Sequence, residues 1–234
     1  MFTIRLAELN IAINNKYEYV KNLCTDYIAK GIPNFYVEVT DFEIEAERRS
    51  PNNDKGFLES LAIYRKIAEK MIDYEGILMH GAIISVDNCG IAFVAKSGTG
   101  KTTHINLWRK LLGNRVKVIN GDKPLLRLVN GKLYAYGTPW AGKEGLNSNI
   151  KAELKNICFI SQGLVNECLC VTDKDLILEK LFSQVYLPKS PRGVKYTLDF
   201  LKIIMLKCRF YSVKCNTDIR AAEIAYKTIL LFRK

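Results

Sequence analysis

Apolar residues recur at strand or helix spacing along most of the chain, and turn residues separate these segments. In the first third, the spacing predicts two strands and two helices, at residues 2–6, 35–40, 17–29 and 57–73. Gly31 and Pro33 should end the first helix, because glycine and proline stop helices. We therefore expect residues 1–75 to form a small N-terminal α+β lobe.

The middle of the chain predicts a hairpin followed by a helix. Two apolar runs, 82–86 and 91–94, are separated by residues 87–90, whose sequence is typical of a tight turn between antiparallel strands. Residues 103–112 carry apolar side chains at helical spacing, and Gly113 is the expected C-cap. The segment between hairpin and helix is therefore a strand-to-helix connection.

A strand and a second hairpin should follow. Residues 115–119 alternate as a strand that ends in Asn-Gly-Asp-Lys-Pro at 120–124. Asn-Gly at 130–131 predicts a two-residue turn between strands at 126–128 and 133–135. The second part of the chain, residues 76–234, is thus expected to contain an α/β core.

The C-terminal part predicts three helices and one strand, at 174–186, 197–206, 217–232 and 211–214. Cys168 and Cys170 lie in an alternating apolar stretch, which favours strand packing over metal ligation. Residues 188–193 predict a flexible basic loop. Its Arg192 matches no motif and is not assigned to a site.

Residues 95–102 read Ala-Lys-Ser-Gly-Thr-Gly-Lys-Thr, a phosphate-binding loop without its first glycine. The expected nucleotide-binding residues are Ser97, Gly98, Thr99, Gly100, Lys101, Thr102 and Thr103. Lys101 can reach the β and γ phosphates, and the Thr102 hydroxyl can ligate Mg²⁺. Ala95 is tolerated in a β conformation but not at positive φ. The competing interpretation is a chance Gly/Lys/Thr loop.

Asp122 is the expected second Mg²⁺ ligand, because it follows a strand beside the phosphate-binding loop. The alternative is a plain turn residue, since Gly-Asp-Lys-Pro is also good turn chemistry.

These motifs together resemble the catalytic domain of HPr kinase/phosphorylase, whose fold is similar to the nucleotide domain of phosphoenolpyruvate carboxykinases. The resemblance extends to small bacterial HPr-kinase-like proteins, through three further motifs: Lys-Thr-Thr-His-x-x-x-Trp at 101–108, Asp-Lys-Pro at 122–124 and Gly-Thr-Pro-Trp-x-Gly-Lys at 137–143. It is specific over residues 76–150 only. It implies a mixed-sheet P-loop kinase core over residues 76–234. It also implies an ATP- and Mg²⁺-dependent kinase that phosphorylates a hydroxyl, usually of serine, on a protein, peptide or small molecule.

One family residue is missing. In the family the strand after the loop ends in two aspartates, and here Gly121 precedes Asp122. Either Asp122 both handles the metal and orients the acceptor, or another base serves, or nucleotide binds without fast transfer. Because phosphoryl transfer depends mainly on positioning and charge, we expect Gly121→Asp to raise activity or change it little.

The chain has two histidines. His80 matches a family histidine near the transferred phosphate, and a hydrogen-bonded histidine at a strand start is the alternative. His104, in the first turn of the helix, either faces the substrate or is exposed.

The resemblance gives Lys143 a role in stabilising charge on the transferred group. A packed loop with a solvated lysine is the alternative. Trp140 either walls the pocket, stacks on a base or packs in the loop.

Composition limits the class of protein. The net charge is +11, but the basic residues are scattered without a recognition motif, so we expect no nucleic acid partner. No apolar run reaches the length of about 20 residues that spans a bilayer, and the N-terminus does not resemble a signal peptide. Seven cysteines without Cys-x-x-Cys argue against disulfides and zinc, and favour reduced thiols in a cytoplasmic protein. We also expect no membrane partner.

The sequence therefore predicts a P-loop serine kinase that uses ATP and Mg²⁺, with Asp122, His80 and Lys143 as candidate catalytic residues. A nucleotide-binding sensor or scaffold with little transfer, and a kinase of free serine or a similar metabolite, are the alternatives. Homo-oligomers are a further expectation, because family kinases often assemble.

Overall fold

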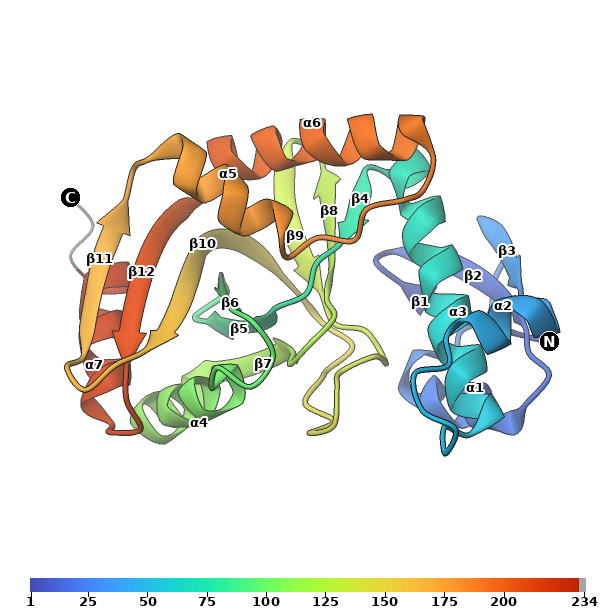
Figure 1. The fold of residues 1–234 in the computed structure, drawn as a ribbon, viewed down its shortest axis with the longest axis horizontal. Coiled ribbons are helices and arrows are strands. Elements are labelled where there is room, and N and C mark those ends of the chain that lie inside the picture. Colours follow the sequence, from blue (N-terminus) through green and yellow to red (C-terminus); the bar gives the residue numbers. More distant parts are fainter. Residues whose placement is uncertain (232–234) are drawn as a thin grey trace.

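The computed structural model describes residues 1–231 of the 234-residue chain and shows a mixed α/β protein (Figure 1). Its N-terminal part contains a three-stranded sheet in the order β1 (Phe2–Leu6), β2 (Leu9–Asn14) and β3 (Phe35–Glu38). Three helices accompany it: α1 (Glu18–Leu23), α2 (Asp41–Ala46) and α3 (Lys55–Lys70). The strand predicted at residues 2–6 is confirmed. The helix predicted over 17–29 is shorter, and the prediction missed β2.

The missed strand follows a tight turn that lacks glycine. Ala7 and Glu8 connect β1 to β2 and both have positive φ, 49° and 66°. Such a two-residue turn is favoured by asparagine and glycine, so an Ala-Glu pair gave no turn signal in the sequence.

A nine-stranded mixed sheet forms the larger part of the protein. Its strands are β4 (Gly76–Leu78), β5 (Ala82–Val86), β6 (Cys89–Val94), β7 (Val116–Asn120), β8 (Leu125–Val129), β9 (Lys132–Tyr136), β10 (Lys151–Gln162), β11 (Glu167–Val171) and β12 (Arg209–Cys215). The order is β4-β8-β9-β10-β6-β5-β7, and β12 joins β10 to β11. The sheet is mixed because β10 runs parallel to β6 and β12 but antiparallel to β9. No prediction covered β10, although it is the strand that holds the sheet together.

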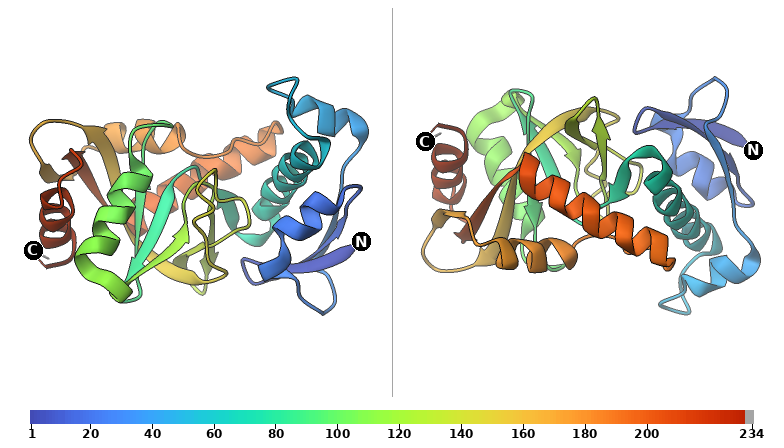
Figure 2. Two further views of the ribbon diagram at one scale, coloured as in Figure 1. Left: turned by 90° about the horizontal axis from the view of Figure 1, so that it is seen from below. Right: turned by 90° about the horizontal axis from the view of Figure 1, so that it is seen from above.

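Helices cover both faces of this sheet (Figures 1 and 2). Helices α4 (Lys101–Leu112) and α7 (Arg220–Tyr226) bury residues such as Trp108 and Ala222 on one face. Helices α5 (Lys174–Phe182) and α6 (Pro191–Lys207) bury residues such as Leu181 and Phe200 on the other. None of the helices within residues 1–231 has the length and apolar character needed to cross a membrane.

Most predicted elements of the larger part are confirmed. Both hairpins form, with Asp87-Asn88 and Asn130-Gly131 at positive φ in their two-residue turns. Gly113 caps α4 at a φ of 56°. The last predicted helix is divided into α7 and a π-helical turn at Lys227–Leu231, and its expected last residue, 232, lies outside the described residues.

The predicted basic loop at 188–193 is wrong in part. Ser190 caps α6 by accepting a hydrogen bond from the Gly193 N–H, and Pro191 occupies the first turn of the helix. Proline suits that position because its missing N–H would have no helical partner. Arg192 therefore lies in a helix, where it forms an ion pair with Asp73 (Nη2 to Oδ1, 2.7 Å).

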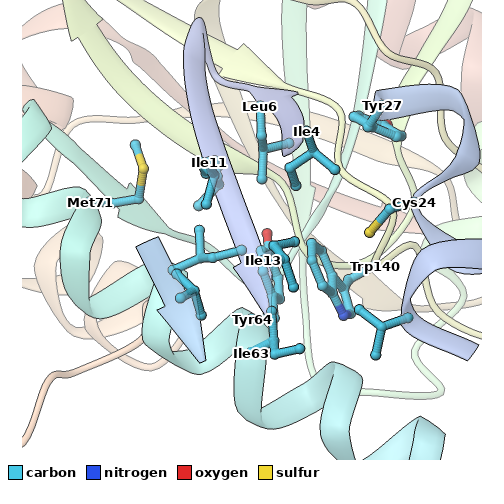
Figure 3. Close-up of a cluster of buried hydrophobic side chains, with 14 of the residues drawn as sticks. Ile4, Leu6, Ile11, Ile13, Cys24, Tyr27, Ile63, Tyr64, Met71 and Trp140 are labelled. Carbon is cyan, nitrogen blue, oxygen red and sulfur yellow. The ribbon is translucent and has the colours of Figure 1, made fainter. Parts of the chain in front are cut away.

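One hydrophobic core connects the two parts of the chain (Figure 3). It combines residues of the small sheet and α3, such as Ile13 and Tyr64, with Leu125, Tyr136 and Trp140 of the larger part. This core contains residues from both sides of residue 75. The domain boundary expected at that residue stays a prediction.

Candidate functional site

The segment 95–100 connects β6 to α4 as an open, glycine-shaped loop. Gly98 and Gly100 have positive φ, 79° and 106°, a conformation that side chains with a Cβ rarely adopt. Gly100 is the N-cap of α4, and no side chain caps this end of the helix. Ala95 is not among the residues with positive φ, so the missing first glycine introduces no backbone strain. The segment is therefore the expected strand-to-helix connection, and its role as a phosphate-binding loop stays a prediction.

Lys101 is folded back over this loop. It is 8% exposed, and its Nζ donates to Ala95 O at 2.9 Å and to Lys96 O at 3.5 Å. Burial lowers the pKa of Lys101, and the negative charge of Asp122 acts in the opposite direction. The ammonium group is thus held at the start of the loop, within electrostatic reach of Asp122.

Asp122 lies just beyond β7, and its Oδ1 is 3.3 Å from Nε2 of His80. Burial raises the pKa of Asp122, but His80, Lys123 and Lys101 together outweigh it and lower this pKa below the usual value. The carboxylate is therefore ionised at neutral pH. Its backbone C=O also accepts a hydrogen bond from the Gly81 N–H at 2.8 Å, which ties it to the segment that carries His80.

Asn120 positions Asp122, and the sequence analysis did not predict this role. It is fully buried, and its Oδ1 accepts hydrogen bonds from the N–H groups of Asp122 (2.8 Å) and Lys123 (2.7 Å). Its Nδ2 donates to the carbonyl and hydroxyl oxygens of Thr138, each at 3.0 Å. The available signal was Asn before Gly-Asp, because asparagine often bonds to the backbone two residues further on.

The segment Gly-Thr-Pro-Trp-Ala-Gly-Lys at 137–143 packs beside the turn that carries Asp122. Gly142 has a φ of 75°, and a Cβ built on it would lie 3.1 Å from Cβ of Asp122. Trp140 is buried at 5% exposure, and its Nε1 donates to Ser60 O at 3.0 Å. Of the three roles considered for Trp140, packing in the loop is therefore the observed one. Lys143 follows Gly142, is exposed, and makes no hydrogen bond or ion pair within residues 1–231.

Position 121 has little room for a side chain. A Cβ on Gly121 would lie 3.2 Å from Leu146 Cβ, 3.3 Å from Leu146 O and 3.4 Å from Ala141 O. The Cβ of an aspartate here would thus make contacts tighter than most Cβ atoms make. The glycine therefore fits the packing of the loops around Asp122.

His104 is buried rather than exposed, although it lines a cavity at the start of α4, so the expectation of an exposed side chain was wrong. It is 1% exposed, and its Nε2 accepts a hydrogen bond from Nε1 of Trp108 at 3.0 Å. Burial lowers the pKa of His104 to about 4, so the ring is neutral at pH 7. Since Nε2 is the acceptor, Nδ1 carries the proton, and Nδ1 has no hydrogen-bond partner within residues 1–231.

Two cavities adjoin the loop. The first, of about 730 Å³, lies between the segment from Ala95 to Thr99, the end of β10 and the end of α5. The second, of about 440 Å³, lies between the start of α4, residues 162–164 and residues 215–217. Thr99 and Gln162 line both, and Gln162 Nε2 donates to Thr99 O at 3.4 Å. The loop thus has one cavity at each end.

Within residues 1–231, no cluster of three or more His, Cys, Asp or Glu side chains could hold a metal ion. A magnesium ion that is held mainly by phosphates and water needs only one or two carboxylates.

Comparison with known proteins gives little further information. No protein-family model matches the chain, and no curated protein matches it. Among solved structures, it is similar to the Hpr(Ser) kinase/phosphatase from Coxiella burnetii. The alignment has 13% sequence identity and a TM-score of 0.30, and covers 56% of this chain and 91% of that one. A TM-score of 0.30 is too low to indicate a function for this chain.

Proposed function

We propose that this protein binds a nucleoside triphosphate with Mg²⁺ and transfers the γ-phosphoryl group to a hydroxyl of the serine type. The observation that carries the proposal is the glycine-shaped loop at the start of α4, with Lys101 folded over it and Asp122 near enough to affect the pKa of that lysine. An ammonium group for phosphate and a carboxylate for a hard cation are the two charges that such a ligand requires.

The residues have separate roles in this proposal. The N–H groups of residues 97–103 hold the phosphates, assisted by the positive end of the α4 dipole. Lys101 leaves the loop carbonyls to bind the β and γ phosphates. Thr102 and Asp122 hold Mg²⁺, which reduces the negative charge of the phosphates during transfer. This use of one carboxylate and one hydroxyl fits an ion whose other ligands are phosphate oxygens and water.

His80 and Asp122 would serve the acceptor. The acceptor oxygen forms a bond to the γ-phosphorus, and the bond between that phosphorus and the bridging oxygen breaks, so the nucleoside diphosphate leaves with the electron pair. With Nε2–H of His80 facing Asp122, Nδ1 is free to take the hydroxyl proton. Lys143 would add positive charge near the transferred group, since it follows Gly142, which adjoins Asp122.

The acceptor would approach through the first cavity. Gln184, on its wall, accepts a hydrogen bond from the backbone N–H of His80 at 2.6 Å, so the cavity adjoins the proposed proton acceptor. Lys96 and Lys180 line the cavity together with Glu179, and the net charge of the chain is +11. This favours an acceptor with acidic groups, such as a serine-bearing protein or peptide, over free serine, which has no net charge at neutral pH.

A second candidate function is nucleotide binding with little or no transfer. Gly121 favours it, because the position lacks a carboxylate and has no room for one without movement of Leu146. Both functions require the same phosphate site, so a transfer assay must distinguish them.

The test is incubation of the protein with γ-labelled ATP, Mg²⁺ and three acceptors: peptides encoded by neighbouring genes, free serine and a cell extract. Mass spectrometry then identifies labelled products. We expect a phosphoserine product that is absent with Lys101→Ala and retained with Lys110→Ala, an exposed lysine near the other end of α4. ATP binding without any labelled product would favour the second function. No ATP binding would rule out both.

A further inference from the structure

We infer that the second cavity, at the start of α4, binds the nucleoside part of the triphosphate. This inference rests on the proposed function, because it concerns the other end of the same ligand. It assigns residues outside the phosphate-binding loop, at 162–164 and 215–217.

The position of Lys101 gives the direction of the ligand along the loop. Its Nζ lies at the carbonyl groups of Ala95 and Lys96, at the start of the loop. A lysine of this kind reaches the β and γ phosphates, so the γ end belongs near that side and near Asp122. The nucleoside then extends toward the opposite end of the loop, where Gly100 and Thr103 line the second cavity.

The rim of this cavity carries an exposed apolar side chain on an anchored turn. Leu164, between β10 and β11, is 94% exposed, and its carbonyl accepts a hydrogen bond from Nδ2 of Asn216 at 3.0 Å. Asn166 Nδ2 donates to Asn216 Oδ1 at 3.0 Å, and the Asn216 N–H donates to Asn166 Oδ1 at 2.9 Å. These bonds hold the two turns together and keep the exposed leucine at the rim of the cavity.

The cavity wall also contains a buried donor that lacks an acceptor. His104 lines the cavity, and within the described part of the chain its Nδ1 has no hydrogen-bond partner. Buried polar groups are nearly always hydrogen-bonded, so this donor calls for a partner, which a water molecule or a ligand in the adjoining cavity would supply. The oxygens and ring nitrogens of a nucleoside are acceptors of the required kind.

The lining fits a nucleoside in size and in chemistry. A volume of about 440 Å³ lies within the range of ~300–1,000 Å³ typical of small-molecule pockets. Leu164 offers an apolar surface to the face of a base, while Thr103 and Thr217 offer hydroxyl groups to the ribose. Inorganic triphosphate lacks both parts and would bind at the loop alone.

The test compares two ligands by calorimetric titration, ATP and inorganic tripolyphosphate, each with Mg²⁺. The variants are Leu164→Ser and the milder Leu164→Ala. Val165→Ser is the matched control, because Val165 is 72% exposed in the same turn but does not line the cavity. Loss of the leucine contact should weaken ATP binding roughly five- to tenfold and leave tripolyphosphate binding unchanged. Val165→Ser should change neither, and Lys101→Ala should weaken both.

The outcomes separate this inference from the proposed function. Unchanged ATP affinity in both Leu164 variants, with Lys101→Ala still weakening it, would overturn the nucleoside pocket and leave the phosphate site standing. Equal weakening of ATP and tripolyphosphate would also overturn it, since the leucine would then act on the loop. Failure of the wild-type protein to bind either ligand would overturn the proposed function and the pocket together.

Discussion

Tyr64 and Trp140 stack with their ring centroids 4.0 Å apart and their planes within 5° of parallel (Figure 3). Tyr64 belongs to α3 of the N-terminal part, and its hydroxyl donates to Lys123 O at 2.6 Å. Trp140 belongs to the segment that packs beside Asp122. The N-terminal part thus supports the turn that carries the proposed metal ligand, through the stacked pair and the hydrogen bonds from Tyr64 to Lys123 O and from Trp140 to Ser60 O.

Trp140→Ala should lower the free energy of unfolding by about 3–5 kcal/mol, because it removes a buried aromatic ring and leaves a cavity. Urea denaturation followed by circular dichroism measures this. Phe42→Ala, which truncates an aromatic side chain that is 84% exposed, is the control and should change stability little. A similar small loss for both variants would mean that the stacked pair contributes little to the fold.

Stability should fall with acid because of His104. Burial lowers its pKa to about 4 from the ordinary 6.5, so on acidification the unfolded chain binds a proton first. Stability is therefore full above about pH 6.5 and is lost as the pH falls toward 4, by roughly 2 kcal/mol between pH 7 and pH 5. His104→Gln retains an acceptor for Trp108 and does not titrate, so the unfolding free energy of this variant should depend less on pH. Identical pH profiles would contradict the assignment.

Lys101→Ala should weaken ATP binding by roughly 1.5–3 kcal/mol, the usual contribution of a hydrogen bond to a charged group. Calorimetric titration of ATP with Mg²⁺ measures the change, and Lys110→Ala is the control. Equal affinities for wild type and Lys101→Ala would refute the phosphate-binding loop.

Asp122→Asn should preserve ATP binding and reduce phosphoryl transfer by roughly 100-fold or more, because the amide keeps the shape of the side chain and removes the charge that Mg²⁺ needs. The measurement is the transfer rate against Mg²⁺ concentration. Asp26→Asn is the control, because Asp26 is exposed and far from Asp122 in the sequence, and it should behave as wild type. Full turnover of Asp122→Asn at low Mg²⁺ would show that the metal is held elsewhere.

The packing at position 121 changes the expectation for Gly121→Asp. A Cβ there would lie 3.2 Å from Leu146 Cβ and 3.3 Å from Leu146 O, so Leu146 would have to move. We now expect a stability loss of about 1–3 kcal/mol and no gain in transfer. Gly121→Ala separates the effect of the Cβ from that of the charge. Increased transfer in Gly121→Asp at unchanged stability would show that the loops adapt and that the missing aspartate limits the reaction.

Local patterns were enough to predict many of the elements and the geometry of the loop. The Asn-Gly turn at 130–131, the Gly113 cap and the glycine-shaped loop before α4 depend on residues that are neighbours in the chain, so their conformations follow from local sterics. The same holds for the expectation that Lys101 lies at the loop. These features could be predicted from the sequence because no distant contact is needed to produce them.

Contacts between distant segments decided the rest. The sequence of β10 shows no single alternation because its middle residues, 156–160, are all buried, with side chains in the cores on both faces of the sheet. The burial of His104 against Trp108, the stacking of Trp140 on Tyr64 and the tight space at Gly121 each depend on which segments the fold brings together. A side chain's pKa, packing and available space are set by neighbours from elsewhere in the chain, and only the tertiary structure brings those neighbours into contact.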